Sequence, residues 1–178
     1  PKGNFITQGN APKQFSGATG DNVKWRVPLP NTGQSAAIIS GGRIFVTSHE
    51  PITQDTQTGA AILGLCFDAE TGEELWRRTI PGTRETDLSS LFNDNTAYSP
   101  VADGKRVIFT NVGGTIKCFD YNGEEIWSHV WTPFGRHHAR AHEPILHDGK
   151  VILLHAPTYD LPVEATTKAG SKKYGRAK

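Results

Sequence analysis

The chain has 178 residues, and its 19 Lys and Arg against 18 Asp and Glu give a formal net charge of +1. A charge so evenly balanced argues against nucleic acid as the main partner. No run of about 18 apolar residues occurs, so the sequence contains no candidate transmembrane helix.

Residues 1–20 are rich in Gly, Asn, Pro and Gln, and we expect an irregular N-terminal lead-in there. From residue 21 onward, short apolar runs alternate with turn residues such as Gly41-Gly42 and Asn122-Gly123, and no helical periodicity is sustained. Strands are predicted in three successive rounds, at 23–29, 35–40, 43–48, 62–68 and 74–80, then 97–102, 106–111, 115–120 and 125–131, then 142–147 and 150–155. Each complete round is predicted to form a four-stranded antiparallel blade.

Two longer polar segments interrupt this series, at 51–59 and 83–95, and loops of this kind lie on the rim of a propeller. We expect the blades to occupy residues 21–160 and a basic linker or tail to occupy 161–178. From Lys168 onward the tail carries five cations and no acid. A solvated linker is the simpler interpretation, and a nucleic-acid-binding arm is the alternative.

The tryptophans show a repeat. Trp25, Trp76 and Trp127 recur at a spacing of 51 residues, and the residues ahead of them recur as well. A turn, an apolar residue and a Trp at such a period indicate a propeller, and closed rings have about four to eight blades. We predict that Trp76 and Trp127 are buried at equivalent places in their blades. The repeat residues are Asp68, Gly72, Trp76, Asp120, Gly123, Trp127 and, in a weaker copy, Trp25.

The segments 65–76 (LCFDAETGEELW) and 118–127 (CFDYNGEEIW) resemble the tryptophan-docking motif of the PQQ-binding-like β-propeller repeat family. The resemblance implies an all-β propeller segment of about three four-stranded antiparallel blades within a ring of seven or eight. The remainder of the propeller is then expected from the same polypeptide or from another chain. That family includes quinoprotein alcohol dehydrogenases and a lipoprotein of the outer-membrane assembly machinery, which implies a periplasmic or secreted protein.

Both cysteines precede the repeat Asp by two residues, as Cys66 and Cys118. Equivalent positions in neighbouring blades lie too far apart for a disulfide, which needs Cα atoms within about 7 Å. We therefore predict two reduced, buried cysteines on corresponding strands.

A candidate ligand site lies in the polar approach to the third round. In an extended segment, His138, Arg140 and His142 share one face, because side chains alternate along a strand. Tyr98 and Asn95 lie in the corresponding approach to the second round. These five residues are predicted to line one mouth of the ring and to favour an anionic ligand such as a carboxylate or an acidic sugar. His138 and His142 could alternatively bind zinc, although no metal site is predicted.

The function predicted first is a binding or scaffold module of the cell envelope or exterior. A PQQ-dependent quinoprotein oxidoreductase with calcium is the first alternative, and the sequence lacks the adjacent Cys pair that the resemblance implies for such enzymes. A carbohydrate-active, lyase-like propeller that uses the His, Tyr and Arg side chains of the mouth is the second. The ligand, any catalytic role, the blade number of the ring and the oligomeric state stay open at this level.

Overall fold

The computed structural model describes residues 12–50, 58–59, 61–83, 86–87, 95–131 and 143–153. Within these ranges the structure contains twelve β-strands, β1 to β12, and no helix. No helix in the described part of the chain is long and apolar enough to cross a membrane. The all-β fold class predicted from the sequence is confirmed.

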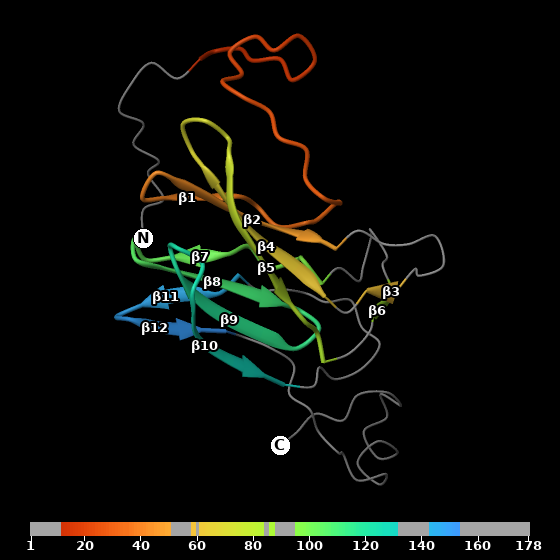
Figure 1. The fold of residues 1–178 in the computed structure, drawn as a ribbon, viewed down its shortest axis with the longest axis vertical. Coiled ribbons are helices and arrows are strands. Elements are labelled where there is room, and N and C mark those ends of the chain that lie inside the picture. Colours follow the sequence, from red (N-terminus) through yellow and green to blue (C-terminus); the bar gives the residue numbers. More distant parts are fainter. Residues whose placement is uncertain are drawn as a thin grey trace, which may run out of the picture.

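Two four-stranded antiparallel sheets form the body of the structure (Figure 1). Blade 1 has the strand order β1-β2-β4-β5, and blade 2 has the order β10-β9-β8-β7. The strands of blade 1 are β1 (Ile38–Ser40), β2 (Arg43–His49), β4 (Ile62–Asp68) and β5 (Glu74–Ile80). Those of blade 2 are β7 (Val101–Ala102), β8 (Arg106–Asn111), β9 (Thr115–Asp120) and β10 (Glu125–Val130). Each blade is therefore a meander in which sequential strands pair.

A third unit begins with the hairpin β11 (Ile145–His147) and β12 (Lys150–Ile152). The described residues thus contain two complete blades and the first two strands of another, where the sequence predicts about three blades. The predicted strand at 23–29 is not observed, because that segment pairs with no neighbouring strand in the described ranges. Its Val27 instead packs on the outer face of blade 1.

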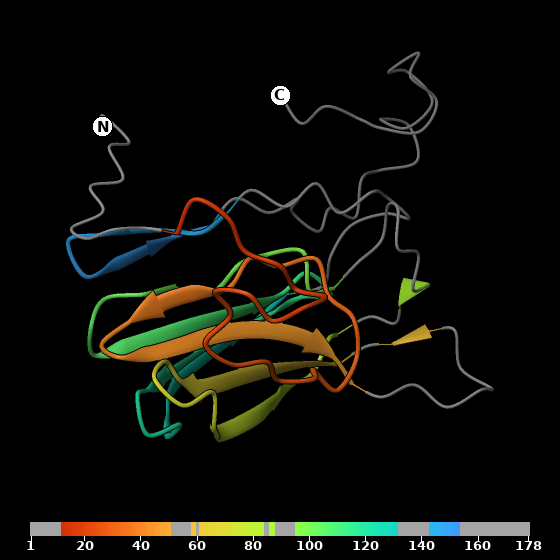
Figure 2. The same ribbon diagram turned by 90° about the horizontal axis from the view of Figure 1, so that it is seen from above.

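Three apolar layers hold these units together. The face of blade 1 toward the lead-in buries Val46, Leu63, Leu65 and Phe67. The layer between the two blades is the largest and contains Phe45, Ile62, Cys66, Trp76, Ile80, Val107, Phe109 and Phe119. The far face of blade 2 buries Ile108, Ile116 and Cys118, and Leu146 and Val151 of the β11–β12 hairpin pack on it. Figure 2 shows the two sheets stacked face to face.

The two blades approach most closely at Gly64 in the middle of β4. A Cβ atom placed on Gly64 would lie 3.0 Å from the ring of Phe109 in blade 2. The Phe109 ring also meets Phe45, Trp76 and Phe119 at tilted or edge-on angles, with centroids 6.1 to 6.4 Å apart. Such geometries are favourable for aromatic pairs, and they fix the separation of the two sheets.

Two short strands from the longer polar segments pair with each other, which the sequence does not predict. Strand β3 (Thr58–Gly59), between β2 and β4, pairs with β6 (Thr86–Asp87), which follows β5. Antiparallel pairing of the two strands makes a small separate sheet beside the end of blade 1 (Figure 1). Residues from the two polar segments therefore lie side by side at β3 and β6.

Cys66 and Cys118 are free and buried, as predicted. They occupy corresponding strands, β4 and β9, and each is paired across the sheet with the repeat Trp of its blade. Burial raises the pKa of both thiols. Since only a thiolate reacts readily, these cysteines are inert parts of the inter-blade layers.

Candidate functional site

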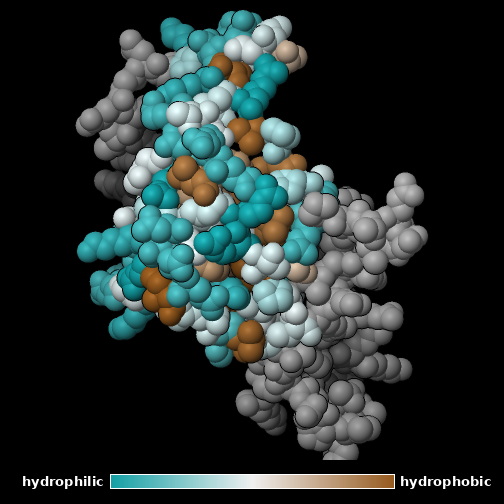
Figure 3. All heavy atoms as spheres, in the orientation of Figure 1, coloured by the Kyte–Doolittle hydropathy of each residue, from teal (hydrophilic) through white to brown (hydrophobic). Residues whose placement is uncertain are grey.

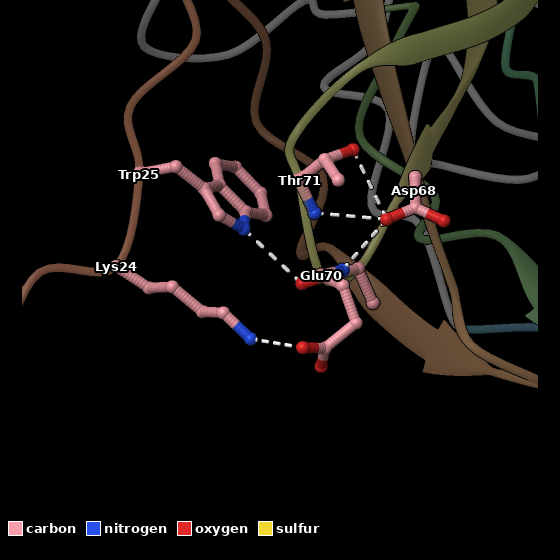
Figure 4. A network of polar contacts seen from close by, with 6 residues as sticks. Lys24, Trp25, Asp68, Glu70 and Thr71 are labelled. Atoms are coloured by element: carbon pink, nitrogen blue, oxygen red, sulfur yellow. Dashed lines mark hydrogen bonds and ion pairs between the residues drawn. The ribbon is translucent and has the colours of Figure 1, made fainter.

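The same contact links each unit to the next one. The indole Nε1 of Trp25 donates to the carbonyl oxygen of Ala69 at 3.1 Å, and Nε1 of Trp76 donates to that of Tyr121 at 3.0 Å. Ala69 and Tyr121 each directly follow a repeat Asp. Each Trp therefore reaches forward to the turn between the last two strands of the following blade. Figure 4 shows the first of these contacts.

A glycine in each turn makes room for the incoming indole. A Cβ atom on Gly72 would lie 2.7 Å from the ring of Trp25, and one on Gly123 would lie 2.9 Å from that of Trp76. Both glycines also have positive φ, +78° and +85°, which other residues adopt only with strain. Two independent constraints therefore require glycine at these turns.

The repeat Asp closes the turn. In the first turn, Asp68 Oδ1 accepts hydrogen bonds from the backbone N–H of Glu70 at 2.9 Å and of Thr71 at 2.8 Å. In the second, Asp120 Oδ1 accepts from the N–H of Asn122 and Glu124. A salt bridge between Lys24 and Glu70 lies beside the first turn (Figure 4). These carboxylates are occupied with backbone groups, which is a structural role.

Acid is expected to loosen the first turn. The backbone N–H groups of Thr71 and Glu70, followed by the Thr71 hydroxyl, lower the pKa of Asp68. A carboxyl with a lowered pKa in the folded state stabilises the fold fully above its unfolded pKa of about 3.9, and this stability is lost as pH falls through the folded value. We expect urea unfolding at pH 6 and pH 3 to show a smaller acid-induced loss of stability for Asp68→Asn than for the unsubstituted chain. Equal losses would contradict this role of Asp68.

Trp127 occupies the same place in blade 2 as Trp76 in blade 1. It is the third residue of β10 and pairs with Cys118, as Trp76 in β5 pairs with Cys66. Trp76 is only 8% exposed, whereas Trp127 is half-buried. The sequence predicts both to be largely buried. The difference arises because, in the described residues, no turn between the last two strands of a following blade lies over Trp127.

Polar contacts connect the three units at residues that come just before the first strand of each unit. We call the contacts between Ala36, Ser99 and Glu143 the polar seam. The Ser99 hydroxyl accepts a hydrogen bond from the backbone N–H of Ala36 in the first unit at 2.9 Å. Ser99 in turn donates to both carboxylate oxygens of Glu143 in the third, from its N–H at 2.7 Å and its hydroxyl at 3.0 Å. The sequence analysis does not single out this seam. The sequence feature that could have indicated it is the alignment of Ser99-Pro100 with Glu143-Pro144 in successive repeats.

Two of the five candidate ligand residues come just before Ser99 in the chain. Asn95 and Tyr98 are 1% and 4% exposed, and the Asn95 carbonyl accepts a hydrogen bond from the Val112 N–H. Burial, with a smaller effect from the negative charge of Glu143, raises the pKa of the Tyr98 phenol. Tyr98 is therefore a neutral phenol at physiological pH. The other three candidates, His138, Arg140 and His142, fall outside the described residues.

The two candidate zinc ligands, His138 and His142, also lie outside the described residues. In the ranges that the structure describes, no group of three or more His, Cys, Asp and Glu side chains is placed to hold a metal ion. Several carboxylates there are engaged in surface ion pairs, such as Asp103 with Arg106 and Glu125 with Lys117.

Comparison with known proteins places the chain in a family. A family model described as outer membrane protein assembly factor BamB matches residues 13–166. The crystal structure of BamB from Moraxella catarrhalis is similar, with 20% identity, a TM-score of 0.48, and coverage of 74% of this chain and 37% of that one. A europium-containing methanol dehydrogenase is similar at 19% identity and a TM-score of 0.39, with 62% and 19% covered. No curated protein sequence matches significantly.

The chain thus spans little more than a third of the length of the BamB structure that it resembles. The matched residues 13–166 include both complete blades, the β11–β12 hairpin and the two turns that receive Trp25 and Trp76. Since the family model covers most of the sequence, the chain belongs to the family of PQQ-like β-propeller repeats that the BamB model describes.

Proposed function

We propose that this chain is part of a non-catalytic propeller that acts as a binding or scaffold module in the cell envelope or exterior. One observation carries the proposal: the last described unit presents a face suited to receive another β-sheet. Ile145 and Ile152 lie opposite each other in β11 and β12 and are 58% and 54% exposed. Trp127 is half-buried on the same side of blade 2. Large apolar side chains exposed together in this way favour a partner that covers them.

The partner of this face is the remainder of the propeller, from the same polypeptide or from another. We interpret the contacts of Trp25 and Trp76 with the following turns as the tryptophan-docking motif of the family. In that interpretation, Asp68, Gly72, Trp76, Asp120, Gly123 and Trp127 are structural residues. Their regular use between units favours a rigid scaffold, because none of these side chains is left for chemistry.

The description of the matching family supports an envelope location, periplasmic or secreted. Fractionation of cells that produce the natural protein tests it. Recovery in the periplasmic, outer-membrane or secreted fraction is expected, and recovery with cytoplasmic markers would contradict the proposed location.

A quinoprotein oxidoreductase is the alternative from a different class. PQQ needs an aromatic ring to stack on and cationic or amide groups for its carboxylates. Four aromatic rings of the described ranges, those of Phe45, Trp76, Phe109 and Phe119, are buried between the blades. These residues therefore do not form a quinone site. Titration of the purified natural protein with PQQ and Ca²⁺ tests the alternative. The scaffold proposal predicts no saturable uptake by visible absorbance, and stoichiometric uptake would overturn it.

We further propose that His138, Arg140 and His142 form a ligand mouth next to Asn95 and Tyr98, for an anionic ligand such as an acidic sugar. The support is their position directly before Glu143, which Ser99 anchors. Binding of an acidic oligosaccharide by calorimetry is expected to weaken at least tenfold in the double variant His138→Ala/Arg140→Ala. The matched control, His147→Ala/Lys150→Ala, changes exposed groups of the nearby hairpin. Equal weakening in both variants would refute a specific mouth. Chain cleavage with formation of an unsaturated sugar would instead support a lyase.

A further inference from the structure

The outer edges of the two blades are protected differently. Among the residues that the structure describes, each blade ends in a strand with no further strand paired to its outer side, β5 in blade 1 and β10 in blade 2. Open edges are templates for pairing with another strand, and proteins commonly guard them with charged side chains. Figure 1 shows β10 as the outermost strand of blade 2.

Strand β5 carries such a guard. Arg77 forms a two-pronged ion pair with Glu74, with N–O distances of 2.5 and 2.6 Å. Its neighbour Arg78 donates to the Gly123 carbonyl and lies over the Trp76 ring at 5.8 Å. Two cations therefore follow Trp76 directly along this edge.

Strand β10 lacks this guard. Counted from the repeat Trp, the residues that correspond to Arg77, Arg78 and Thr79 are Ser128, His129 and Val130. The only acid of the strand, Glu125, lies at its start and is paired with Lys117. The edge of β10 is consequently close to neutral and partly apolar.

Strand β10 carries two exposed apolar side chains. Val130 is 58% exposed, and Ile126 is 50% exposed. Ser128 pairs with Lys117 and Val130 with Thr115, so these two share a face opposite to Trp127. Ile126 directly precedes Trp127 and lies at the register shift between Glu125 and Trp127, where the regular alternation of faces is interrupted. Most of the surface seen in Figure 3 is hydrophilic, with separate hydrophobic spots.

The backbone of β10 is oriented so that the N–H and C=O groups of Ser128 can bond to a further strand. The Trp131 N–H donates to the Gly114 carbonyl, on the side of β9. Since hydrogen-bonding direction alternates along an antiparallel strand, Ser128 and Val130 direct their backbone groups outward.

We propose that the open edge of β10 pairs antiparallel with the same edge of a second copy of this chain, with a two-fold axis at Ser128. In this register Ile126 of each copy lies opposite Val130 of the other, and the two serines face each other. The contact is self-complementary, as a two-fold interface must be, and it brings no two like charges into opposition. This self-complementarity favours a second copy over a strand from an unrelated protein.

Substitutions at matched positions test the interface. Sedimentation equilibrium of the full chain is expected to show a dimer, and Val130→Lys is expected to raise its dissociation constant at least tenfold. Thr79→Lys, at the same place in β5, is the control and should have no effect. Ile145→Lys tests the apolar face of β11–β12. A monomer at all concentrations, or a dimer disrupted by Ile145→Lys but not by Val130→Lys, overturns the proposal.

Cross-linking gives an independent readout that does not depend on folding stability. Opposed residues of a hydrogen-bonded antiparallel pair have Cα atoms about 5.5 Å apart, within the range that a disulfide spans. Under mild oxidation, Ser128→Cys is expected to form a covalent dimer, whereas Arg77→Cys, its counterpart in β5, stays monomeric. The native Cys66 and Cys118 are buried and contribute little background. If Ser128→Cys and Arg77→Cys cross-link equally, the pairing at β10 is refuted.

Discussion

Replacing Trp76 with alanine is expected to lower the free energy of unfolding by about 3–5 kcal/mol, the usual loss for a buried large aromatic side chain. Trp76 contacts Phe45, Phe109 and Phe119 in the layer between the blades. It also donates its indole N–H to the Tyr121 carbonyl, which loses this donor in the variant.

Trp127→Ala is the matched control for this experiment, because Trp127 has the same place in its blade but is only half-buried. We expect a clearly smaller loss in urea unfolding followed by far-UV circular dichroism, since less apolar area returns to water. Equal losses for the two variants would mean that burial of the repeat Trp is not what stabilises the junction.

Gly123→Ala is the second substitution with a large expected effect. At a φ of +85°, alanine costs about 1–2 kcal/mol in backbone strain. Its Cβ atom would also lie 2.9 Å from the Trp76 ring, and such overpacking typically adds about 1–3 kcal/mol. We therefore expect a total destabilisation of about 2–5 kcal/mol in urea unfolding.

Gly104→Ala separates these two contributions. Gly104 has a φ of +90°, and a Cβ atom there would meet nothing within 4 Å. This variant should therefore show the strain alone. If Gly104→Ala destabilises the chain as much as Gly123→Ala, the close approach of Trp76 contributes nothing to the requirement for glycine.

The sequence predicts the blades well because their signals are local. The turn residues and alternating apolar runs mark β8 and β9 directly, and the spacing of Trp76 and Trp127 shows that the blades repeat. The strand predicted at 23–29 is wrong because a strand also needs a neighbour to pair with, and apolar alternation carries no information about that neighbour.

Contacts between distant segments were harder to predict. The pairing of β3 with β6 depends on two loops meeting in space, and neither loop has a strand-like pattern of its own. The hydrogen bonds from Ser99 to Glu143 join residues of different blades. Glu143 and Ser99 occupy corresponding positions of the repeat, and their residue types alone do not predict that they bond to each other. Of the predicted mouth, only Asn95 and Tyr98 lie in the described ranges, so the placement of His138, Arg140 and His142 stays a prediction.

The forward direction of the Trp contacts has a consequence for biosynthesis. Trp76 is buried only when the turn that contains Tyr121 is present, and that turn is made 45 residues later. At about 5–20 residues per second, a ribosome needs roughly 2 to 9 s to supply it. During that interval the nascent blade 1 exposes an indole and the aromatic side chains around it. A chaperone that binds such surfaces would therefore act on each blade in turn, and would be released as the next blade folds over it.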